Sequence, residues 1–214
     1  MFKSVLVDYG LVLCSAPAKK SIEEIVQIFG IDHSTFWTLY ERNRGVYDRG
    51  DLDGEEYWQR FAEDTASTLD QAQIDWLRRR DIEMWSQLEE DMLLWVDQLR
   101  AAGYQTSILS NLNKEFTRHM RTKCDWIHRF DFQVFSAEIG QIKPEPEIYQ
   151  HCLKLLGSTP EETLFIDDRE SNVAAARAQG IASIRFRSPG QLREELEAIG
   201  FPVLPMATRS TKTT

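Results

Sequence analysis

Val5-Leu6-Val7-Asp8-Tyr9-Gly10-Leu11-Val12-Leu13 is an apolar run interrupted by an acidic residue. The part from Lys3 to Val7 is typical of a strand that is covered on both faces in a parallel sheet. Because ligands of open α/β sheets bind at the carboxyl ends of the strands, we expect Asp8 at the mouth of a site. A carboxylate there is a candidate nucleophile or metal ligand, although it would also suit the cap of a following helix.

The sequence after residue 87 alternates between helical and strand patterns. Helices are predicted over 92–99, 114–123, 148–156 and 173–179, and strands over 104–109, 130–135, 163–166 and 182–186. This alternation is typical of an α/β protein whose crossovers are right-handed. We therefore predict a Rossmann-like parallel sheet with helices on both faces.

A helical insertion interrupts this pattern directly after the first strand. Between residues 16 and 86 the apolar residues recur at intervals of three and four, which predicts four amphipathic helices, one of them capped by Ser34. The insertion follows Asp8, so we expect it to form a helical cap over the mouth of the site. The predicted units are an α/β core (1–15 and 87–204), a cap (16–86) and a disordered tail (205–214).

The composition limits the possible partners. The chain has 214 residues, 42% apolar and 28% charged, as is usual for a globular protein. Its formal net charge is −9 without a cluster of basic residues, so we expect no nucleic-acid partner. The absence of a long apolar run predicts no membrane span, and three cysteines without metal or disulfide spacing favour a cytoplasmic location. A small molecule is the expected partner, and the oligomeric state is unknown.

Polar residues follow four of the predicted strands. In a parallel sheet these positions share one edge, so a carboxylate, a hydroxyl, a cation and an acidic pair are expected around one spot. Each has a structural alternative as a helix cap, a solvated lysine or an acidic first turn, but all four in this order are hard to explain that way. They are Asp8, Ser110 with Asn111, Lys143, and Asp167 with Asp168.

Four sequence motifs carry this arrangement. They are Val7-Asp8-Tyr9-Gly10, Leu109-Ser110-Asn111, Ile142-Lys143-Pro144-Glu145-Pro146-Glu147-Ile148-Tyr149 and Phe165-Ile166-Asp167-Asp168-Arg169-Glu170-Ser171-Asn172. The arrangement resembles the haloacid dehalogenase superfamily, and the helical insertion resembles the small cap of its subfamily I. Within that subfamily the chain resembles bacterial sugar-phosphate phosphatases, including the glucose 1-phosphate type, and the amino-terminal phosphatase domain of soluble epoxide hydrolases.

The resemblance implies a phosphatase that uses a covalent intermediate. Asp8 would attack phosphorus and become an aspartyl phosphate, which water then hydrolyses. A Mg²⁺ cofactor would be held by Asp8, Asp168 and the backbone carbonyl of Gly10, with Asp167 as a further acidic contact, direct or through water. The implied substrate is a small phosphate ester, with sugar phosphates favoured.

The resemblance also implies the remaining catalytic and binding groups. Lys143 would offset charge on the transferring phosphoryl group, and Ser110 with the backbone amide of Asn111 would donate hydrogen bonds to its oxygens. In the cap, Arg42, Arg44 and Tyr47 are candidate contacts for the sugar hydroxyls or a second phosphate of the substrate. A solvated helix face is an equally good interpretation of the two arginines.

Gly10 departs from the family pattern, which has a second aspartate here as general acid and base. Such a group typically contributes about 10²- to 10⁴-fold to the rate. Either the favoured substrates leave without full protonation, as anomeric sugar phosphates or acyl phosphates do, or a water or a cap residue supplies the proton. Asp48, Asp51 and Tyr47 are the cap candidates, and the sequence singles out none of them.

Two other functions stay open. A haloacid dehalogenase-type hydrolase needs neither a leaving-group proton nor a metal, and those relatives also lack the second aspartate. The acidic pair argues against it, because two carboxylates facing Asp8 would repel it unless a cation lay among them. The other alternative is a catalytically impaired phosphate-binding module that kept the scaffold.

Overall fold

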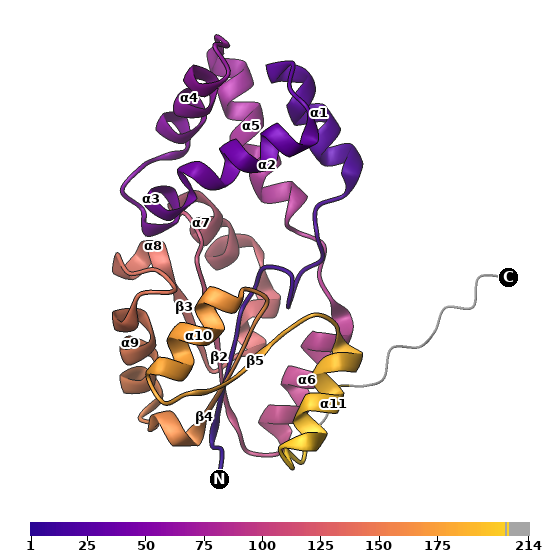
Figure 1. Ribbon diagram of the computed structural model, residues 1–214, viewed down its shortest axis with the longest axis vertical. Coiled ribbons are helices and arrows are strands. Elements are labelled where there is room, and N and C mark those ends of the chain that lie inside the picture. Colours follow the sequence, from indigo (N-terminus) through magenta and orange to yellow (C-terminus); the bar gives the residue numbers. More distant parts are fainter. Residues whose placement is uncertain (204, 206–214) are drawn as a thin grey trace, which may run out of the picture.

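A five-stranded parallel sheet lies at the centre of the computed structural model, which describes residues 1–203 and Pro205 (Figure 1). The strand order is β3-β2-β1-β4-β5, so β1, which leads to Asp8, lies in the middle. This is the predicted Rossmann-like α/β fold. The strands are β1 (Ser4–Val7), β2 (Gln105–Ser110), β3 (Phe132–Phe135), β4 (Thr163–Asp167) and β5 (Ala182–Arg185).

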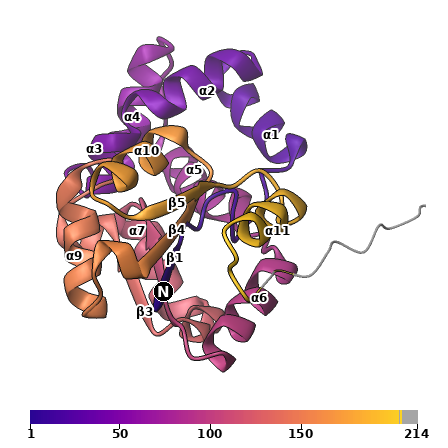
Figure 2. The same ribbon diagram turned by 60° about the horizontal axis from the view of Figure 1, so that its bottom comes forward.

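Helices cover both faces of the sheet, which explains why its strands are apolar runs without alternation. Val5 and Val7 pack into the hydrophobic core on one face, and Leu6 packs into the core on the other. The first face is covered by α6 (Glu90–Ala101), α7 (Lys114–Lys123) and α11 (Pro189–Ala198), and the second by α9 (Pro146–Leu156) and α10 (Glu170–Ala178) (Figure 2).

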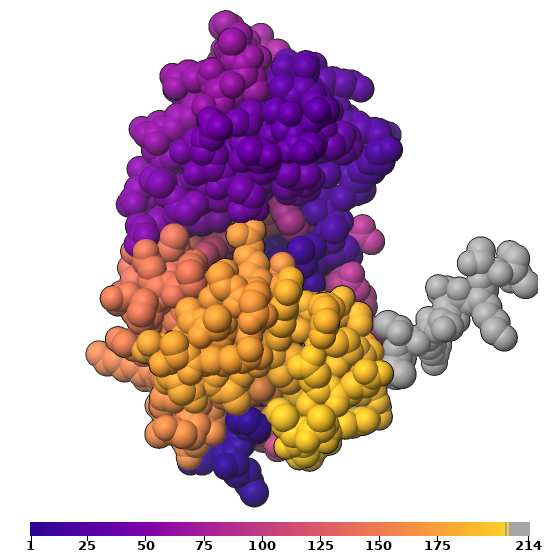
Figure 3. Space-filling model, in the orientation of Figure 1, coloured from indigo at the N-terminus to yellow at the C-terminus, as the bar shows by residue number. Residues whose placement is uncertain are grey.

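A second group of helices, here called the helical block, lies over the carboxyl ends of the strands (Figure 1). It has a hydrophobic core of its own, in which the rings of Phe29, Trp58 and Phe61 contact one another. Figure 3 shows the molecule hollowed between the block and the α/β part. The block consists of α1 (Lys19–Phe29), α2 (His33–Arg42), α3 (Arg44–Arg49), α4 (Gly54–Asp64) and α5 (Gln71–Met84).

Several local features of the structure differ from those predicted from the sequence. The cap of α2 is Asp32, whose side chain accepts a hydrogen bond from the Thr35 amide at 2.7 Å, so the prediction of Ser34 as the cap was wrong. Helix α11 was not predicted, although Ser188 caps it and Pro189 begins it. Val46 and Tyr47 were predicted as a continuation of the preceding helix, whereas they form the separate helix α3. The short segments α8 (Ser136–Ile139), η1 (Asp125–Arg129) and η2 (Pro160–Glu162) were not predicted.

The predicted tail, residues 205–214, lies outside the described residues except for Pro205. That residue is buried, and its carbonyl oxygen accepts a hydrogen bond from Arg193 Nη1 at 3.1 Å. In the part of the chain that the structure describes, every helix is too short or too polar to cross a bilayer.

Candidate active site

The carboxyl ends of three neighbouring strands bring the acidic residues and Ser110 together. Asp8 follows β1, Asp167 ends β4 and Asp168 follows it, and one carboxylate oxygen from each lies within 4.8 Å of the others. Ser110 ends the adjacent strand β2. Parallel pairing of β1 with β2 and with β4 therefore gathers these residues at one edge of the sheet.

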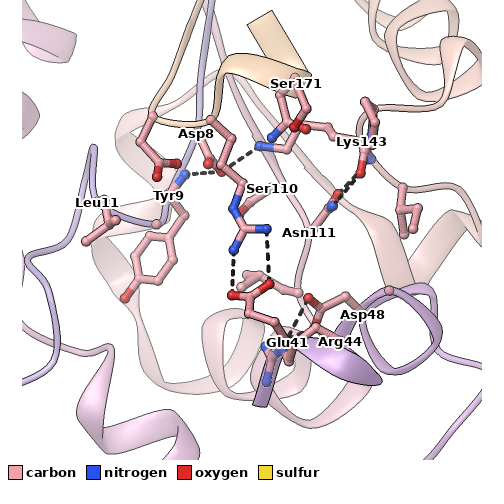
Figure 4. A pocket seen from close by; sticks show the side chains of 18 of the residues that line it. Asp8, Tyr9, Leu11, Glu41, Arg44, Asp48, Ser110, Asn111, Lys143 and Ser171 are labelled. Atoms are coloured by element: carbon pink, nitrogen blue, oxygen red, sulfur yellow. Dashed lines mark hydrogen bonds and ion pairs between the residues drawn. The ribbon is translucent and has the colours of Figure 1, made fainter. Parts of the chain in front are cut away.

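This edge forms one side of a cavity of about 360 Å³. Asp8, Gly10, Ser110 and Lys143 line it from the α/β part. The opposite side comes from the helical block, and Figure 4 shows Glu41, Arg44 and Asp48 facing the strand ends across the cavity. The lining residues of the block are Tyr40, Glu41, Arg44, Gly45, Asp48 and Trp85.

Lys143 is buried between two of the carboxylates, with a side chain that is 1% exposed. Its Nζ lies 2.7 Å from Asp8 Oδ1 and donates hydrogen bonds to Asp167 Oδ2 at 2.6 Å and to the carbonyl oxygen of Leu109 at 2.9 Å. Burial disfavours the charge on the ammonium, but the carboxylates outweigh burial and raise the pKa of Lys143. The lysine is therefore a fixed positive charge beside Asp8.

The Asp167 carboxylate is almost fully occupied by hydrogen bonds from the protein. Its Oδ1 accepts from the Arg169 amide at 2.8 Å and from Asn172 Nδ2 at 3.0 Å, while Oδ2 accepts from Lys143 and from Asn172 Nδ2 at 3.1 Å. Complete burial raises the pKa of this carboxyl group. Asp167 is thus occupied by Lys143, Asn172 and the Arg169 amide, and Asp8 and Asp168 are the acidic groups that line the cavity from the strand ends.

The acidic residues fit a divalent metal ion. Burial, reinforced by the charge of Asp8, raises the pKa of Asp168 to about 6, which reflects the cost of placing these carboxylates together. Lys143 supplies only one positive charge against three carboxyl groups. Carboxylate and carbonyl oxygens are the ligands that Mg²⁺ prefers, and Asp8, Asp168 and Gly10 offer them from one side of the cavity.

Asn111 holds the loop that carries the lysine. Its Nδ2 donates to the carbonyl oxygen of Lys143 at 2.8 Å, and its Oδ1 accepts from the Lys143 amide at 2.8 Å. This pair of bonds joins the end of β2 to the loop before α9. The sequence suggested only the backbone amide of Asn111 as a functional group, and the motif gave no signal for the side chain.

A buried serine connects the strand ends to the helical block. Ser136 Oγ accepts a hydrogen bond from the Leu112 amide at 2.9 Å and donates one to the carbonyl oxygen of Asp48 at 2.5 Å. Leu112 lies in the loop that follows Ser110 and Asn111. One hydroxyl therefore fixes α3 relative to that loop.

Arg44 occupies the side of the cavity that the helical block provides. Its Nη2 lies 2.9 Å from Asp48 Oδ1, and its Nη1 lies 3.2 Å from Asp81 Oδ2 and 3.0 Å from the Tyr40 hydroxyl oxygen. The guanidinium also packs over the ring of Tyr40, 4.7 Å from its centroid. Two carboxylates thus neutralise the arginine where it faces the cavity.

A family model of haloacid dehalogenase-like hydrolases matches residues 15–180, more than half of the chain. The chain belongs to the haloacid dehalogenase-like hydrolase family. The matched region contains Ser110, Lys143 and the acidic pair, and it begins after Asp8.

Individual relatives of this haloacid dehalogenase-like hydrolase include phosphatases. The D-ribitol-5-phosphate phosphatase of Bacteroides thetaiotaomicron is 23% identical over 213 residues, covering 93% of this chain and 98% of that protein. Bifunctional epoxide hydrolase 2 of Rattus norvegicus is 33% identical over 126 residues, or 56% of this chain, which spans only 23% of the rat protein's length. A solved structure of a family enzyme from B. thetaiotaomicron, in complex with magnesium and inorganic phosphate, has a TM-score of 0.69 at 22% identity, covering 87% and 95% of the two chains.

Two of the three cap residues predicted to contact substrate do not line the cavity of this haloacid dehalogenase-like hydrolase. Arg42, the last residue of α2, is 53% exposed and forms an ion pair with Asp64 at 2.5 Å. Tyr47 is buried in the helical block, where it stacks on Tyr57 with the centroids 4.3 Å apart. Neither lines the cavity, because their helices direct them to the surface and to the core of the block. Arg44, the third cap residue predicted to contact substrate, does line the cavity.

An ion pair that the sequence did not predict joins the two sides of the cavity. Glu41 Oε1 lies 2.8 Å from Arg169 Nη2, and both residues line the cavity. Glu41 belongs to α2, whereas Arg169 directly follows the acidic pair of this haloacid dehalogenase-like hydrolase. The residues are 128 positions apart, so no local pattern could have indicated the contact.

Proposed function

We propose that this hydrolase is a Mg²⁺-dependent phosphatase that cleaves a small phosphorylated metabolite, with sugar phosphates as the favoured class. The observation that carries the proposal is the grouping of Asp8, Asp168 and buried Lys143 at one side of a cavity large enough for a small metabolite. The name of the ribitol-phosphate phosphatase and the magnesium and phosphate bound to a solved relative support the same reaction class.

Asp8 is the proposed nucleophile. Its Oδ1 accepts a hydrogen bond from the Tyr9 amide at 2.7 Å and lies 2.7 Å from Lys143 Nζ, so these contacts orient the carboxylate and leave Oδ2 to attack phosphorus. The phosphoryl group would transfer to Asp8 and then to water. The Lys143 ammonium would offset the negative charge on the oxygens of the transferring phosphoryl group.

The other groups of the site would bind and orient the phosphoryl group. Ser110 Oγ and the Asn111 amide would donate hydrogen bonds to its oxygens. Asp8, Asp168 and the Gly10 carbonyl would hold Mg²⁺, which when bound supplies positive charge against the phosphate and the carboxylates.

The helical block would act as a cap, as proposed for residues 16–86 over a core formed by residues 1–15 and 87–204. Its side of the cavity contains Trp85 and Tyr40, which would exclude water and contact the part of the substrate beyond the phosphate. The Glu41–Arg169 ion pair would help to hold this cap against the core.

The experiment measures release of inorganic phosphate from sugar, acyl, alkyl and nucleotide phosphates with Mg²⁺ and with a chelator. The native chain is compared with Asp8→Asn, and Asp125→Asn in η1 is a control outside the cavity lining. Mg²⁺-dependent release that only the Asp8 change abolishes supports the proposal. Absence of release with every substrate would reject it. Chelator-insensitive halide release from a 2-haloacid would then identify a dehalogenase, and binding of phosphate without turnover would identify an impaired phosphate-binding module.

A further inference from the structure

The structure separates the three residues that the sequence offered as substitutes for the missing aspartate at Gly10. The Asp51 side chain is 60% exposed, and its Oδ2 lies 3.6 Å from Arg49 Nε in an ion pair. Asp51 does not line the cavity. Tyr47 is buried away from the cavity. Only Asp48, of these three, lines the cavity.

Asp48 is buried and held in a fixed position. The residue is 8% exposed, and its carbonyl oxygen is bound by Ser136 Oγ, which also contacts the loop after Ser110 and Asn111. The Arg44 guanidinium lies beside the carboxyl group, with Nε 3.3 Å from Oδ2 and Nη2 2.9 Å from Oδ1. The Nη2 contact lacks hydrogen-bond geometry, so Oδ1 is a buried oxygen that receives no hydrogen bond from the described residues.

Asp48 and Asp8 approach the cavity from opposite sides. Asp8 comes from the end of β1 and Asp48 from α3 of the helical block, as Figure 4 shows. In an in-line displacement at phosphorus, the leaving oxygen departs on the side opposite the attacking oxygen. With Asp8 as the nucleophile, that oxygen would face the helical block.

We propose that Asp48 is the general acid and base of the reaction, in the role that Gly10 leaves unfilled. The inference rests on the proposed phosphatase function. As the Asp8 Oδ2–P bond forms and the ester P–O bond breaks, the electron pair of that bond passes to the leaving oxygen. The leaving oxygen takes the proton of the Asp48 carboxyl group and departs as a neutral alcohol. The Asp48 carboxylate then removes a proton from the water whose oxygen attacks phosphorus. The Asp8 Oδ2–P bond breaks and inorganic phosphate leaves, which restores the Asp8 carboxylate and the protonated Asp48 carboxyl group.

The electrostatic surroundings of Asp48 agree with this role. Burial is the largest effect and raises the pKa of Asp48 to about 7, with the Arg44 charge opposing it and the Asp81 charge reinforcing it. Glu41 on α2 also raises this pKa. A general acid is most effective when its pKa lies near the working pH, because both protonation states are then available.

The test compares Asp48→Asn, which keeps the shape of the side chain, with Asp51→Asn as a matched control three positions away. Each variant is assayed with Mg²⁺ on an alkyl monoester, beginning with ribitol 5-phosphate, and on acetyl phosphate and 4-nitrophenyl phosphate. The latter two release stable anions that need no proton. We expect Asp48→Asn to lower kcat for the alkyl monoester about 10²- to 10⁴-fold and to leave kcat for the other two within about 10-fold. Asp48→Glu should restore part of the alkyl activity.

The outcomes distinguish this inference from the proposed function. An equal fall for all three substrates, or an unchanged alkyl rate, would overturn the role of Asp48 while leaving the phosphatase intact. A native chain that cleaves acetyl phosphate but no alkyl monoester would also overturn it. A native chain that releases phosphate from nothing would reject the proposed function itself, and this inference with it.

Discussion

Two cations paired with aspartates line the same cavity, the buried Lys143 in the α/β part and the largely buried Arg44 in the helical block, whose side chain is 13% exposed. Lys143, in the loop between α8 and α9, lies between Asp8 and Asp167 at the strand ends. Both oxygens of Asp167 accept hydrogen bonds from the protein, whereas the contacts of Asp8 with Tyr9 and Lys143 are made by its Oδ1. Lys143 therefore lies where the proposed phosphoryl transfer would occur.

Arg44 has the same pattern of charges in a different setting. It lies between Asp48 and Asp81, but the rings of Tyr40, Tyr47 and Tyr57 also surround its guanidinium. A cation that two carboxylates and three aromatic rings enclose has little capacity left for a substrate anion. The difference teaches that burial between two aspartates does not by itself make a phosphate-binding cation, and that Arg44 serves chiefly to organise its neighbours.

Replacing Lys143, the cation proposed to act in catalysis, should have the largest effect. We expect Lys143→Met to lower phosphate release by at least about 10²- to 10³-fold, because the transferring phosphoryl group loses a preorganised positive charge. The change also leaves two buried carboxylates unpaired, which costs about 3–5 kcal/mol in the free energy of unfolding. Lys154→Met, on the exposed side of α9, is the control for loss of a lysine. Native rates in the Lys143 variant would remove the distinction between the two cations.

Replacing the structural cation should mainly affect stability. Arg44→Met leaves Asp48 and Asp81 buried without their partner, and we expect the free energy of unfolding in urea to fall by about 3–5 kcal/mol. Adding Asp81→Asn should recover part of this loss, because the Asp81 carboxylate that has lost its partner is removed. A double variant no more stable than the single one would contradict this account.

The pH dependence of the free energy of unfolding should show whether Asp48 carries a proton in the folded chain. Its pKa of about 7 lies above the value of 3.8 for a free aspartate, so the folded chain retains a proton that the unfolded chain releases. The stability that Asp48 contributes is therefore complete below about pH 4 and is lost as the pH rises through 7. At about 1.36 kcal/mol per pKa unit, the loss is at most about 4 kcal/mol.

This contribution is measured as a difference between two chains. Urea unfolding of the native chain and of Asp48→Asn at several values between pH 5 and 8 should show the native chain losing stability relative to the variant. The comparison cancels the titration of the carboxyl groups at the strand ends. Parallel curves would mean that Arg44 keeps Asp48 ionised throughout.

Replacing the exposed arginine should have the smallest effect. Arg42 and Arg44 are two positions apart, but Arg42 forms a half-exposed ion pair with Asp64. We expect Arg42→Met to change the free energy of unfolding by less than about 1 kcal/mol and to leave the KM of the best substrate unchanged. A clear rise in KM would restore Arg42 as a substrate contact.

The regular elements of the fold were readable from sequence because their signals are local. The five strands begin and end within two residues of the predicted positions, and α7 was predicted with the observed bounds. The short helices α3 and α8 were not readable, since a helix of four to six residues depends on tertiary contacts. Helix α11 had a readable start at Ser188 and Pro189, but only two of its residues, Leu192 and Leu196, are buried.

The two sides of the cavity also differed in how far the sequence could predict their residues. Topology alone places Asp8, Ser110 and Asp167 at one edge of a parallel sheet, so strand prediction is enough to group them. The helical block contributes through the angle at which α2 and α3 dock, which no periodicity specifies. That angle sends Arg42 to the surface and brings Arg44 to the cavity.

The Ser136 hydroxyl has one proton and two carbonyl oxygens within reach. It donates to Asp48 at 2.5 Å, and the carbonyl oxygen of Leu112 lies 3.2 Å from the same Oγ. If the helical block were to lift away, rotation about the Cβ–Oγ bond would redirect the hydroxyl hydrogen to the Leu112 carbonyl oxygen, and the hydroxyl would keep an acceptor throughout. This one hydrogen bond between the block and the α/β part can therefore break at small enthalpic cost, because a second acceptor takes the place of the first.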